Sequence, residues 1–262
     1  MEPFKISIVI PILNEEAVIG KLLRHLIENF SKSNIAEVIV VDGGSTDGSK
    51  QIANSFVTSS DSDASESYRE VGGKGPDTFL QSKNTRPDIR ILDSEKGRAK
   101  QMNFGAKHAK GNILYFLHAD SFPPKHFDKL IINEVRSGHL AGCFKMKFES
   151  NHWWLRLAGW FTQFNWRMCR GGDQSQFITK SLFDDIGGFD EQFIIYEDND
   201  LVNKLYAIQQ FTVIQEWLTT SARRYHKNGV WKLQYHFWVI HLKKWLGDSA
   251  ENLLIYYKKH IY

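Results

Sequence analysis

Short apolar runs alternate with helical repeats along the first half of the chain. The runs are rich in β-branched residues and cover 6–10, 37–41, 89–92 and 113–117. Each is typical of a strand that is buried on both faces. Over residues 19–30, apolar side chains recur three and four positions apart, as on the buried face of a helix. This alternation, with short connections, predicts an α/β fold with a doubly wound, mostly parallel sheet flanked by helices.

Polar residues indicate where the first two helices begin. Asn14 is a good N-cap, and the two acids that follow it suit the positive end of a helix. Ser45 or Thr46 would cap the next helix in the same way. Residues 55–88 break the rhythm, because they are rich in Ser, Asp, Gly and Lys and show no apolar periodicity. We expect an exposed, mobile insertion there.

The pattern changes after Gly142. Residues 143–148 alternate apolar and polar side chains, which is typical of an antiparallel or edge strand. Further strands are predicted over 176–179 and 212–218, and a helix begins at the acidic run 197–200. We therefore expect a smaller, antiparallel portion beside the parallel sheet.

An aromatic helix is predicted over residues 229–246. One apolar stripe consists of Trp231, Tyr235, Trp238, Leu242 and Trp245. A second stripe consists of Val230, Leu233, Phe237 and Ile240. Because the remaining polar strip is narrow, the helix is docked against the domain, lies in a homo-oligomer contact, or is pressed into a membrane interface. The pattern favours docking or a subunit contact.

Composition and charge narrow the class of protein. The chain has 262 residues, 24% of them charged, and a formal net charge of +3, which does not indicate a nucleic-acid partner. Two cysteines, Cys143 and Cys169, are too few for a disulfide framework and suit a reducing compartment. We find no signal peptide and no apolar stretch long enough to span a bilayer. The sequence predicts a cytoplasmic protein, soluble or peripheral to the inner face of the membrane.

Three acidic sites end or follow predicted strands. Asp42 ends the second run in a glycine-rich turn, Asp120 follows the fourth run, and Glu197-Asp198 starts a helix. We expect Asp42 and Asp120 at the carboxyl edge of the sheet, where α/β sheets bind ligands. Asp120 suits Mg²⁺ or Mn²⁺ as a hard oxygen ligand, and Asp198 suits a general base. Each acid also has a structural interpretation, because turns and helix N-termini favour carboxylates.

A basic pair, Arg223-Arg224, follows the last predicted strand. Guanidinium groups at that position would hold a diphosphate through paired hydrogen bonds. A solvated surface cluster would have the same sequence, so both interpretations stay open. The histidines and cysteines show no zinc-type spacing.

Taken together, these motifs resemble the family 2 glycosyltransferases of the GT-A fold. The motifs that carry the resemblance lie at 7–15, 40–48, 97–106, 116–120, 172–174 and 197–201. The forms Leu117-His-Ala-Asp120 and Gly172-Asp-Gln174, with residues 220–224, most resemble the branch labelled arsenosugar-biosynthesis-type glycosyltransferases. The match covers most of the chain apart from residues 55–88.

The resemblance implies a role for each matching residue. The nucleotide-sugar-binding residues would be Pro11, Asn14, Glu15, Asp42, Asp47, Arg98, Asn103, Arg223 and Arg224. The acceptor side would include Gly172, Asp173 and Gln174. Asp198 would be the catalytic base, with Glu197 beside it.

A divalent metal is also implied by the resemblance. Asp120 would be the remaining acid of the family's Asp-x-Asp motif, and His118 stands where the first Asp usually does. Since a neutral imidazole can ligate Mn²⁺, the expected cofactor is Mn²⁺ or Mg²⁺. The donor would be a nucleotide-diphospho-sugar and the transfer to an acceptor hydroxyl would be inverting. The alternatives are a polyprenyl-phosphate sugar transferase at the membrane surface and a non-catalytic sugar-nucleotide-binding protein.

We expect a single GT-A domain over residues 1–262. Residues 1–140 would form the nucleotide-sugar-binding half, and 141–228 the acceptor and catalytic half. Residues 229–262 would form a C-terminal helical extension.

Overall fold

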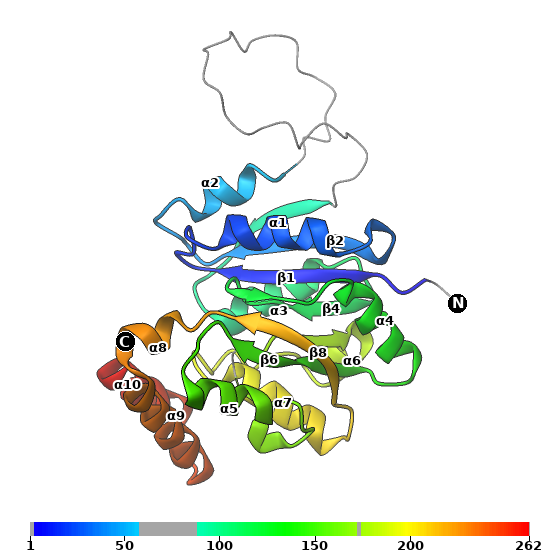
Figure 1. Cartoon of the computed structure of the whole chain (residues 1–262). Helices are drawn as coiled ribbons and strands as arrows, with labels where there is room; N and C mark the ends of the chain where they lie inside the picture. The colour runs from blue at the N-terminus through cyan, green and yellow to red at the C-terminus, as the bar shows by residue number, and fades with distance from the viewer. Residues whose placement is uncertain (1–2, 58–87, 172–173, 262) are drawn as a thin grey trace, which may run out of the picture.

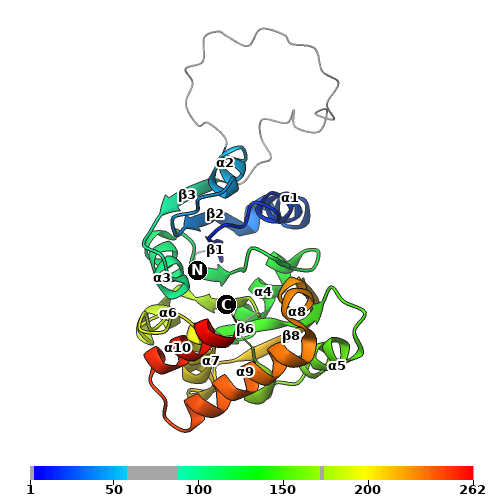
Figure 2. The same ribbon diagram turned by 90° about the vertical axis from the view of Figure 1, so that its left-hand side faces the viewer.

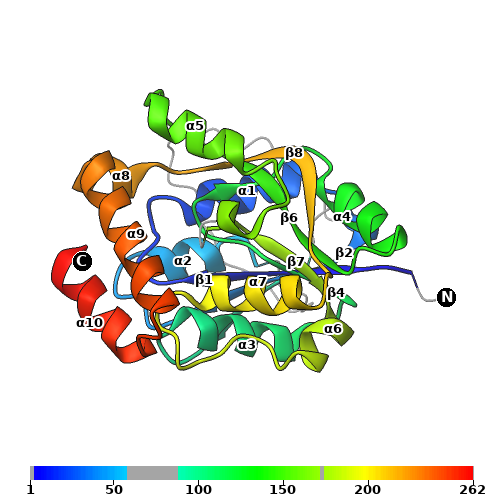
Figure 3. The same cartoon turned by 90° about the horizontal axis from the view of Figure 1, so that it is seen from below.

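One eight-stranded sheet runs through the computed structural model, which describes residues 3–57, 88–171 and 174–261. Helices cover both faces of the sheet (Figures 1 and 3). The insertion expected over 55–88 falls largely outside the described residues, as do Gly172 and Asp173. The predicted division into halves at residue 140 stays a prediction.

The parallel half of the sheet contains the four predicted runs. β1 (Ile6–Ile12) lies between β2 (Ile35–Asp42) and β4 (Ile113–Phe116), and β3 (Ile89–Asp93) lies beyond β2. All four strands are parallel to their neighbours in this half. The expected doubly wound, mostly parallel α/β sheet is therefore confirmed.

Two layers of helices cover the parallel strands (Figure 3), and alternate side chains of the strands pack against each layer. Ile8 and Ile10 of β1 pack on one side, and Val9 packs on the other. The helices on the first side are α1 (Ile19–Asn29) and α4 (Phe127–Arg136). Those on the second side are α3 (Arg98–His108), α6 (Lys180–Asp185) and α7 (Glu197–Ala207). Because both faces are apolar, burial of hydrophobic surface stabilises both layers.

The two expected helix caps are wrong. α1 begins five residues after Asn14, whose backbone has a left-handed φ of 58°. Asn14 Oδ1 accepts a hydrogen bond from Thr46 N at 2.8 Å. α2 (Ser49–Asn54) begins after Asp47, whose carboxylate accepts from Ser49 N at 2.9 Å. The loops that follow β1 and β2 therefore bond to each other, which draws Asn14, Ser45 and Thr46 away from capping.

The other half of the sheet is mixed. β7 (Gln176–Thr179) is antiparallel to both β4 and β6 (Ala141–Phe148). β8 (Thr212–Thr220) is parallel to β6, and β5 (Ser121–Phe122) is antiparallel to β8. The antiparallel portion is therefore confirmed, but residues 143–148 do not form an edge strand. β8 returns from α7 and pairs with β6 on the side that would otherwise be open.

The C-terminal helices lie beyond the carboxyl ends of the parallel strands (Figures 1 and 2). They are α8 (Arg223–Asn228), α9 (Val230–Trp245) and α10 (Ala250–His260). α9 confirms the helix predicted over 229–246. Leu233 and Ile240 of its second stripe are buried, whereas the first stripe is exposed. Over the residues described, no helix combines the length and apolarity needed to cross a bilayer.

The remaining short elements connect these layers. They are α5 (Trp153–Phe161) and the 3₁₀ turns η1 (Lys32–Asn34) and η2 (Arg167–Cys169). α5 packs against β6, since Thr162 at its end accepts a hydrogen bond from Met146 N at 2.7 Å.

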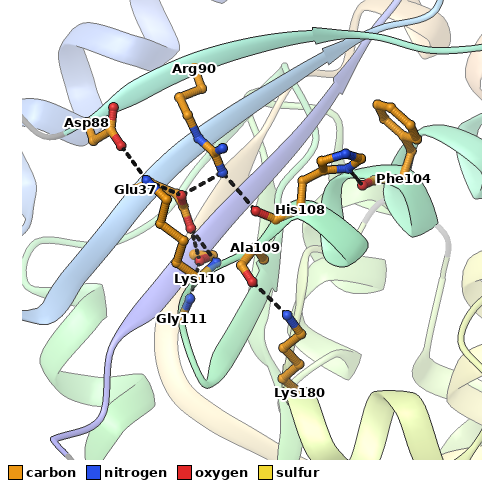
Figure 4. Close-up of polar contacts among 10 residues, drawn as sticks. Glu37, Asp88, Arg90, Phe104, His108, Ala109, Lys110, Gly111 and Lys180 are labelled. Carbon is orange, nitrogen blue, oxygen red and sulfur yellow. Dashed lines mark hydrogen bonds and ion pairs between the residues drawn. The ribbon is translucent and has the colours of Figure 1, made fainter. Parts of the chain in front are cut away.

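A buried carboxylate joins the parallel strands at their amino ends (Figure 4). Glu37 of β2 is fully buried and accepts hydrogen bonds from the Ser7 hydroxyl at 2.6 Å and the Arg90 guanidinium at 2.7 Å. It also accepts from Lys110 N at 2.7 Å, and the Lys110 ammonium lies 3.7 Å away. These groups come from β1, β3 and the turn before β4. Glu37 therefore links all four parallel strands.

Replacing Arg90 tests this link. Arg90→Gln leaves a fully buried carboxylate with one more distant ammonium, so we expect a loss of about 3 kcal/mol in the free energy of unfolding, measured by urea denaturation. Lys50→Gln is the matched control, because the ion pair between Lys50 of α2 and Asp93 of β3 is exposed and its loss should change the free energy of unfolding little. The double variant Glu37→Gln, Arg90→Gln should recover part of the loss. Equal effects of Arg90→Gln and Lys50→Gln would contradict this role.

Candidate active site

A cavity of about 810 Å³ lies at the carboxyl ends of β1 and β4. Its walls come from the loops after these strands, the start of α3, the end of β8 and the C-terminal helices. This edge is where open α/β sheets bind ligands. The predicted site residues that line it are Pro11, Glu15, Arg98, His118, Asp120, Arg223 and Arg224.

The two acids predicted as catalytic lie next to this cavity. Glu197 and Asp198 are 1% and 3% exposed, and both form ion pairs with Arg98 of the cavity wall. Arg98 Nε is 2.9 Å from Glu197 Oε1, and Arg98 Nη1 is 3.2 Å from Asp198 Oδ2. His118 Nε2 lies 3.7 Å from the same Asp198 oxygen. Residues about 80 to 100 positions apart thus meet at one edge of the cavity.

Local backbone geometry holds the two acids against Arg98. Tyr196, the residue before α7, adopts a left-handed φ of 80°, a strained conformation for a residue with a side chain. The centroid of its ring lies 6.1 Å from that of Phe193, in the preceding loop, and 5.4 Å from that of His241, in α9. Gln176 of β7 donates a hydrogen bond to the backbone oxygen of Asp198 at 3.4 Å. The first turn of α7 is therefore held from two sides.

A second ion-pair group forms the opposite wall. Arg223 Nη2 donates to both carboxylate oxygens of Glu15 at 2.6 Å, and its Nε lies 3.6 Å from Asp120 Oδ2. Burial lowers the pKa of Arg223, but the hydrogen bond and charge of Glu15 raise it by more. Arg223 is therefore a permanent cation between two acids.

The cavity carries more positive than negative side chains. The cations on its walls are Lys96, Arg98, Arg223, Arg224 and Lys258. The acids among its lining residues are Glu15 and Asp120. An excess of cations at the carboxyl edge of the sheet suits an anionic ligand such as a diphosphate.

Three predicted nucleotide-binding residues, Asn14, Asp42 and Asp47, form hydrogen bonds within and between the loops that follow β1 and β2. Asp42 is buried, and its carboxylate accepts from Ser45 N at 3.1 Å and the Ser45 hydroxyl at 2.5 Å. Asn14 and Asp47 hold the neighbouring loop through Thr46 and Ser49. The three are absent from the cavity lining over the described residues. Their role as nucleotide ligands stays a prediction.

Asn103 and Gln174 also lie outside the lining. The Asn103 side chain donates to Phe189 O and to Glu191 Oε1, both at 2.9 Å, so it ties α3 to the loop before α7. Gln174 is buried and accepts from Gly171 N at 3.3 Å. Gly172 and Asp173, the other predicted acceptor-side residues, are outside the described residues.

Sequence reasoning missed the role of Gln101. Its side chain is buried, lines the cavity, and donates to Ile12 O and Val41 O, both at 2.8 Å. It therefore joins the carboxyl ends of β1 and β2. A Cβ on Gly43 would lie 2.9 Å from its amide carbon, so glycine is required there for the close approach. The sequence signal for this role was the position of Gln101, a polar amide on the otherwise apolar buried face of α3.

Comparison with known proteins identifies the family. A family model described as glycosyl transferase family 2 matches residues 7–75 and 77–190, more than half of the chain. The chain belongs to this family. This membership agrees with the resemblance stated from the sequence. The resemblance to the arsenosugar-biosynthesis-type branch stays a prediction.

Curated relatives in the family are longer proteins. The chain is 25% identical over 218 residues to the probable glycosyltransferase YdaM of Bacillus subtilis. The aligned region covers 77% of this chain and 46% of YdaM. The chain is 23% identical over 253 residues to the beta-monoglucosyldiacylglycerol synthase of Synechocystis sp., covering 87% of this chain and 47% of that protein. The chain thus spans about half the length of these relatives.

Solved structures share the fold. Staphylococcus aureus TarS residues 1–349, in complex with UDP-GlcNAc, match with a TM-score of 0.62 and 21% identity over 83% of this chain and 58% of that fragment. The mannosyltransferase PcManGT of Pyrobaculum calidifontis, in complex with GDP-Man and Mn²⁺, matches with a TM-score of 0.61 and 17% identity over 95% of this chain and 66% of PcManGT. The GT-A fold expected from the sequence is confirmed.

The side chains of Asp120 and His118 at the cavity fit a divalent metal that is held by few protein ligands and by substrate phosphates. Over the described residues, no group of three or more His, Cys, Asp or Glu side chains could hold a metal ion. Mg²⁺ and Mn²⁺, however, are often held by one or two protein ligands, with substrate phosphates and waters completing the shell. Asp120 and His118 both line the cavity and offer an oxygen and a nitrogen donor. They fit a metal that binds together with a diphosphate.

Glu15, which pairs with Arg223, should make the stability of the protein depend on pH. Burial raises the pKa of Glu15 above its ordinary value of 4.5, although Arg223 lowers it. The folded state then retains a proton that the unfolded state releases, so Glu15 makes stability fall as pH rises from 4.5 towards the folded-state pKa. We expect the unfolding free energy of the wild type, minus that of Glu15→Gln, to decrease over this range.

Urea denaturation at a series of pH values measures this difference. Glu28→Gln, on the exposed side of α1, is the control variant. A difference that increases with pH would show that the Arg223 ion pair outweighs the burial of Glu15, contrary to the expectation.

Proposed function

We propose that this glycosyltransferase moves a sugar from a nucleotide-diphospho-sugar to an acceptor hydroxyl with inversion, and that Asp198 is the general base. The observation that carries the proposal is that Asp198, which is absent from the cavity lining over the described residues, contacts Arg98 and His118 of the cavity wall, while Asp120 and Arg223 line the same cavity. A candidate base thus lies next to a wall that carries cations and a metal-ligand candidate. A base and groups that neutralise the charge on the leaving group both assist displacement at an anomeric carbon.

The proton transfer is assigned to the Asp198 carboxylate. The acceptor oxygen forms a new bond to the anomeric carbon as the bond from that carbon to the diphosphate oxygen breaks. The acceptor proton passes to Asp198, and the nucleoside diphosphate leaves with the bonding electron pair. Attack opposite the leaving group inverts the configuration. Arg98 orients Asp198 through the contact at 3.2 Å.

Glu197 is proposed to position Arg98 rather than to react. Its carboxylate is more deeply buried than that of Asp198, and it lies 2.9 Å from Arg98 Nε on the far side of the guanidinium from Nη1. With two acids on one guanidinium, the orientation of the plane is set by both contacts. Asp198 then has a fixed place relative to the cavity.

The leaving diphosphate is assigned to the cationic wall. Arg223, Arg224 and Lys96 would take its negative charge through hydrogen bonds. Asp120, with His118, would hold Mn²⁺ or Mg²⁺, and the metal when bound supplies further neutralisation of that charge. Because Arg223 already bonds to Glu15, binding of the diphosphate would compete with that ion pair. In the absence of a diphosphate, the ion pair with Glu15 thus holds Arg223 in place.

Asp198→Asn tests the proposed base. The isosteric change removes the proton acceptor, and we expect turnover to fall by about 10²- to 10⁴-fold. Binding of UDP or GDP should be unchanged, since the variant keeps the shape of the cavity wall. Turnover is measured as release of nucleoside diphosphate from a panel of sugar nucleotides. Asp200→Asn is the control, because Asp200 pairs with Lys204 along the same helix. Normal turnover by Asp198→Asn would remove Asp198 from this role.

A metal requirement is tested by binding as well as by activity. We expect UDP or GDP to raise the melting temperature more with Mn²⁺ than with EDTA, because a ligand that binds the folded state stabilises it. Asp120→Asn should abolish the metal-dependent part of the shift. Uridine or guanosine, which lack the diphosphate, should give the same shift with and without Mn²⁺. An undiminished metal effect in Asp120→Asn would contradict the assignment of Asp120.

A further inference from the structure

Two helices each turn an apolar side towards solvent. On α9 the exposed residues are Trp231, Tyr235, Trp238, Leu242 and Trp245. On α5 they are Trp153, Leu157, Trp160 and Phe161. Their exposed fractions range from 37% for Leu157 to 81% for Trp245. Each set recurs at helical spacing, so it forms one side of its helix. We call the two sets together the aromatic face.

The aromatic face is continuous between the helices. Trp231 of α9 contacts both Trp153 and Trp154 of α5, with ring centroids 5.7 and 5.4 Å apart. Trp154 also contacts Trp238 at 6.0 Å. At the far end of α5, Trp160 contacts Phe164 at 5.0 Å. The surface therefore extends from α9 along α5 and into the loop that follows it.

The fold itself does not use this face. Leu233 and Ile240 of α9 and Leu155 of α5 point the other way and belong to one buried cluster. These side chains already dock the helices on the domain. Large exposed apolar surfaces of this kind are typical of sites that bind a partner or a membrane.

Charge is segregated towards the same end of the molecule. Residues 223–260 contain eight Lys and Arg and two acids, a net charge of +6. The rest of the chain contains 25 basic and 28 acidic residues, a net charge of −3. α5 and α9 themselves contain basic residues and no acids. The aromatic face is thus bordered by positive charge.

We propose that the aromatic face binds the surface of a bilayer that contains anionic lipids. Trp and Tyr are amphipathic and settle at the level of the headgroups, and neighbouring lysines are attracted to anionic lipids. No described helix is able to cross a bilayer, so the association is with its surface. This inference goes beyond the proposed transfer and does not depend on it.

A second copy of the chain fits the same surface less well. In a two-fold symmetric contact the same patch meets itself, so the basic residues of α5 and α9 would lie close to their symmetry copies. Juxtaposed like charges oppose association. Lysine is also depleted at the centre of protein–protein interfaces. Charge complementarity therefore selects an anionic partner.

The orientation of α9 gives the association a consequence for the cavity. Leu233 and Phe237 of α9, with Leu254 and Tyr257 of α10, line the cavity. The opposite side of α9 is the aromatic face. One helix therefore separates the proposed membrane surface from the candidate active site, and the bound protein would hold its cavity close to the lipid headgroups.

Co-sedimentation with vesicles tests the proposal. We expect the full chain to bind vesicles of phosphatidylcholine with phosphatidylglycerol, and to bind phosphatidylcholine alone much more weakly. The triple variant Trp231→Ser, Trp238→Ser, Trp245→Ser should lose at least about tenfold in binding. Lys232→Gln should weaken binding to the anionic vesicles by roughly fivefold, an effect that high salt removes from the wild type as well.

Controls separate surface binding from damage to the fold. Val57→Ser with Ile208→Ser removes exposed apolar side chains elsewhere and should bind vesicles as the wild type does. Far-ultraviolet circular dichroism and UDP or GDP binding report whether each variant is folded. Absence of vesicle binding by the wild type would overturn the proposal. So would a dimer, seen by light scattering, that the tryptophan substitutions dissociate while vesicles stay unbound. Equal binding to neutral and anionic vesicles would overturn the role of charge.

Discussion

The arrangement of the site depends on the guanidinium of Arg98, which pairs with two buried acids. Two adjacent carboxylates, Glu197 and Asp198, are buried at the start of α7, and ionised groups are costly to bury without a partner. Arg98 meets both, and it comes from α3, on the other side of the β4–β7 junction. The ion pairs therefore require the parallel and mixed halves of the sheet to be packed together. A site built this way exists only in the complete fold.

Much of the fold could be predicted because burial leaves a strong pattern in the sequence. Strands covered on both faces, such as β1 and β4, show uninterrupted apolar runs, and α1 shows a clear helical repeat. The carboxyl edge of these strands then locates Asp120, and the contact between Asp198 and His118 brings Asp198 to the same edge. By contrast, the alternation over 143–148 indicates an antiparallel or edge strand, whereas β6 lies inside the sheet, because it also pairs with β8, a segment about 70 residues away. Such non-local pairing leaves little local signal.

The details that could not be predicted depend on contacts between loops. Asn14 has the composition of a helix cap, yet its side chain bonds to Thr46 because the ends of β1 and β2 are adjacent. Asn103 stands in the same motif as Arg98, but it lies on the side of α3 that meets the loop before α7. α8 is too short and polar to show an apolar repeat. In each case, tertiary packing selects among several local possibilities.

Tyr196, whose backbone is strained, connects the C-terminal helix α9 to the two acids at the start of α7. A left-handed residue of this kind costs of order 1–3 kcal/mol and persists where neighbouring structure compensates for it. Part of that compensation is the ring contact with His241, in the middle of α9. A protein shortened by removal of α9 and α10 would keep every strand of the sheet and both acids. It would nevertheless lack a support for the turn that orients them, so the sheet and the acids are not by themselves a minimal transferase.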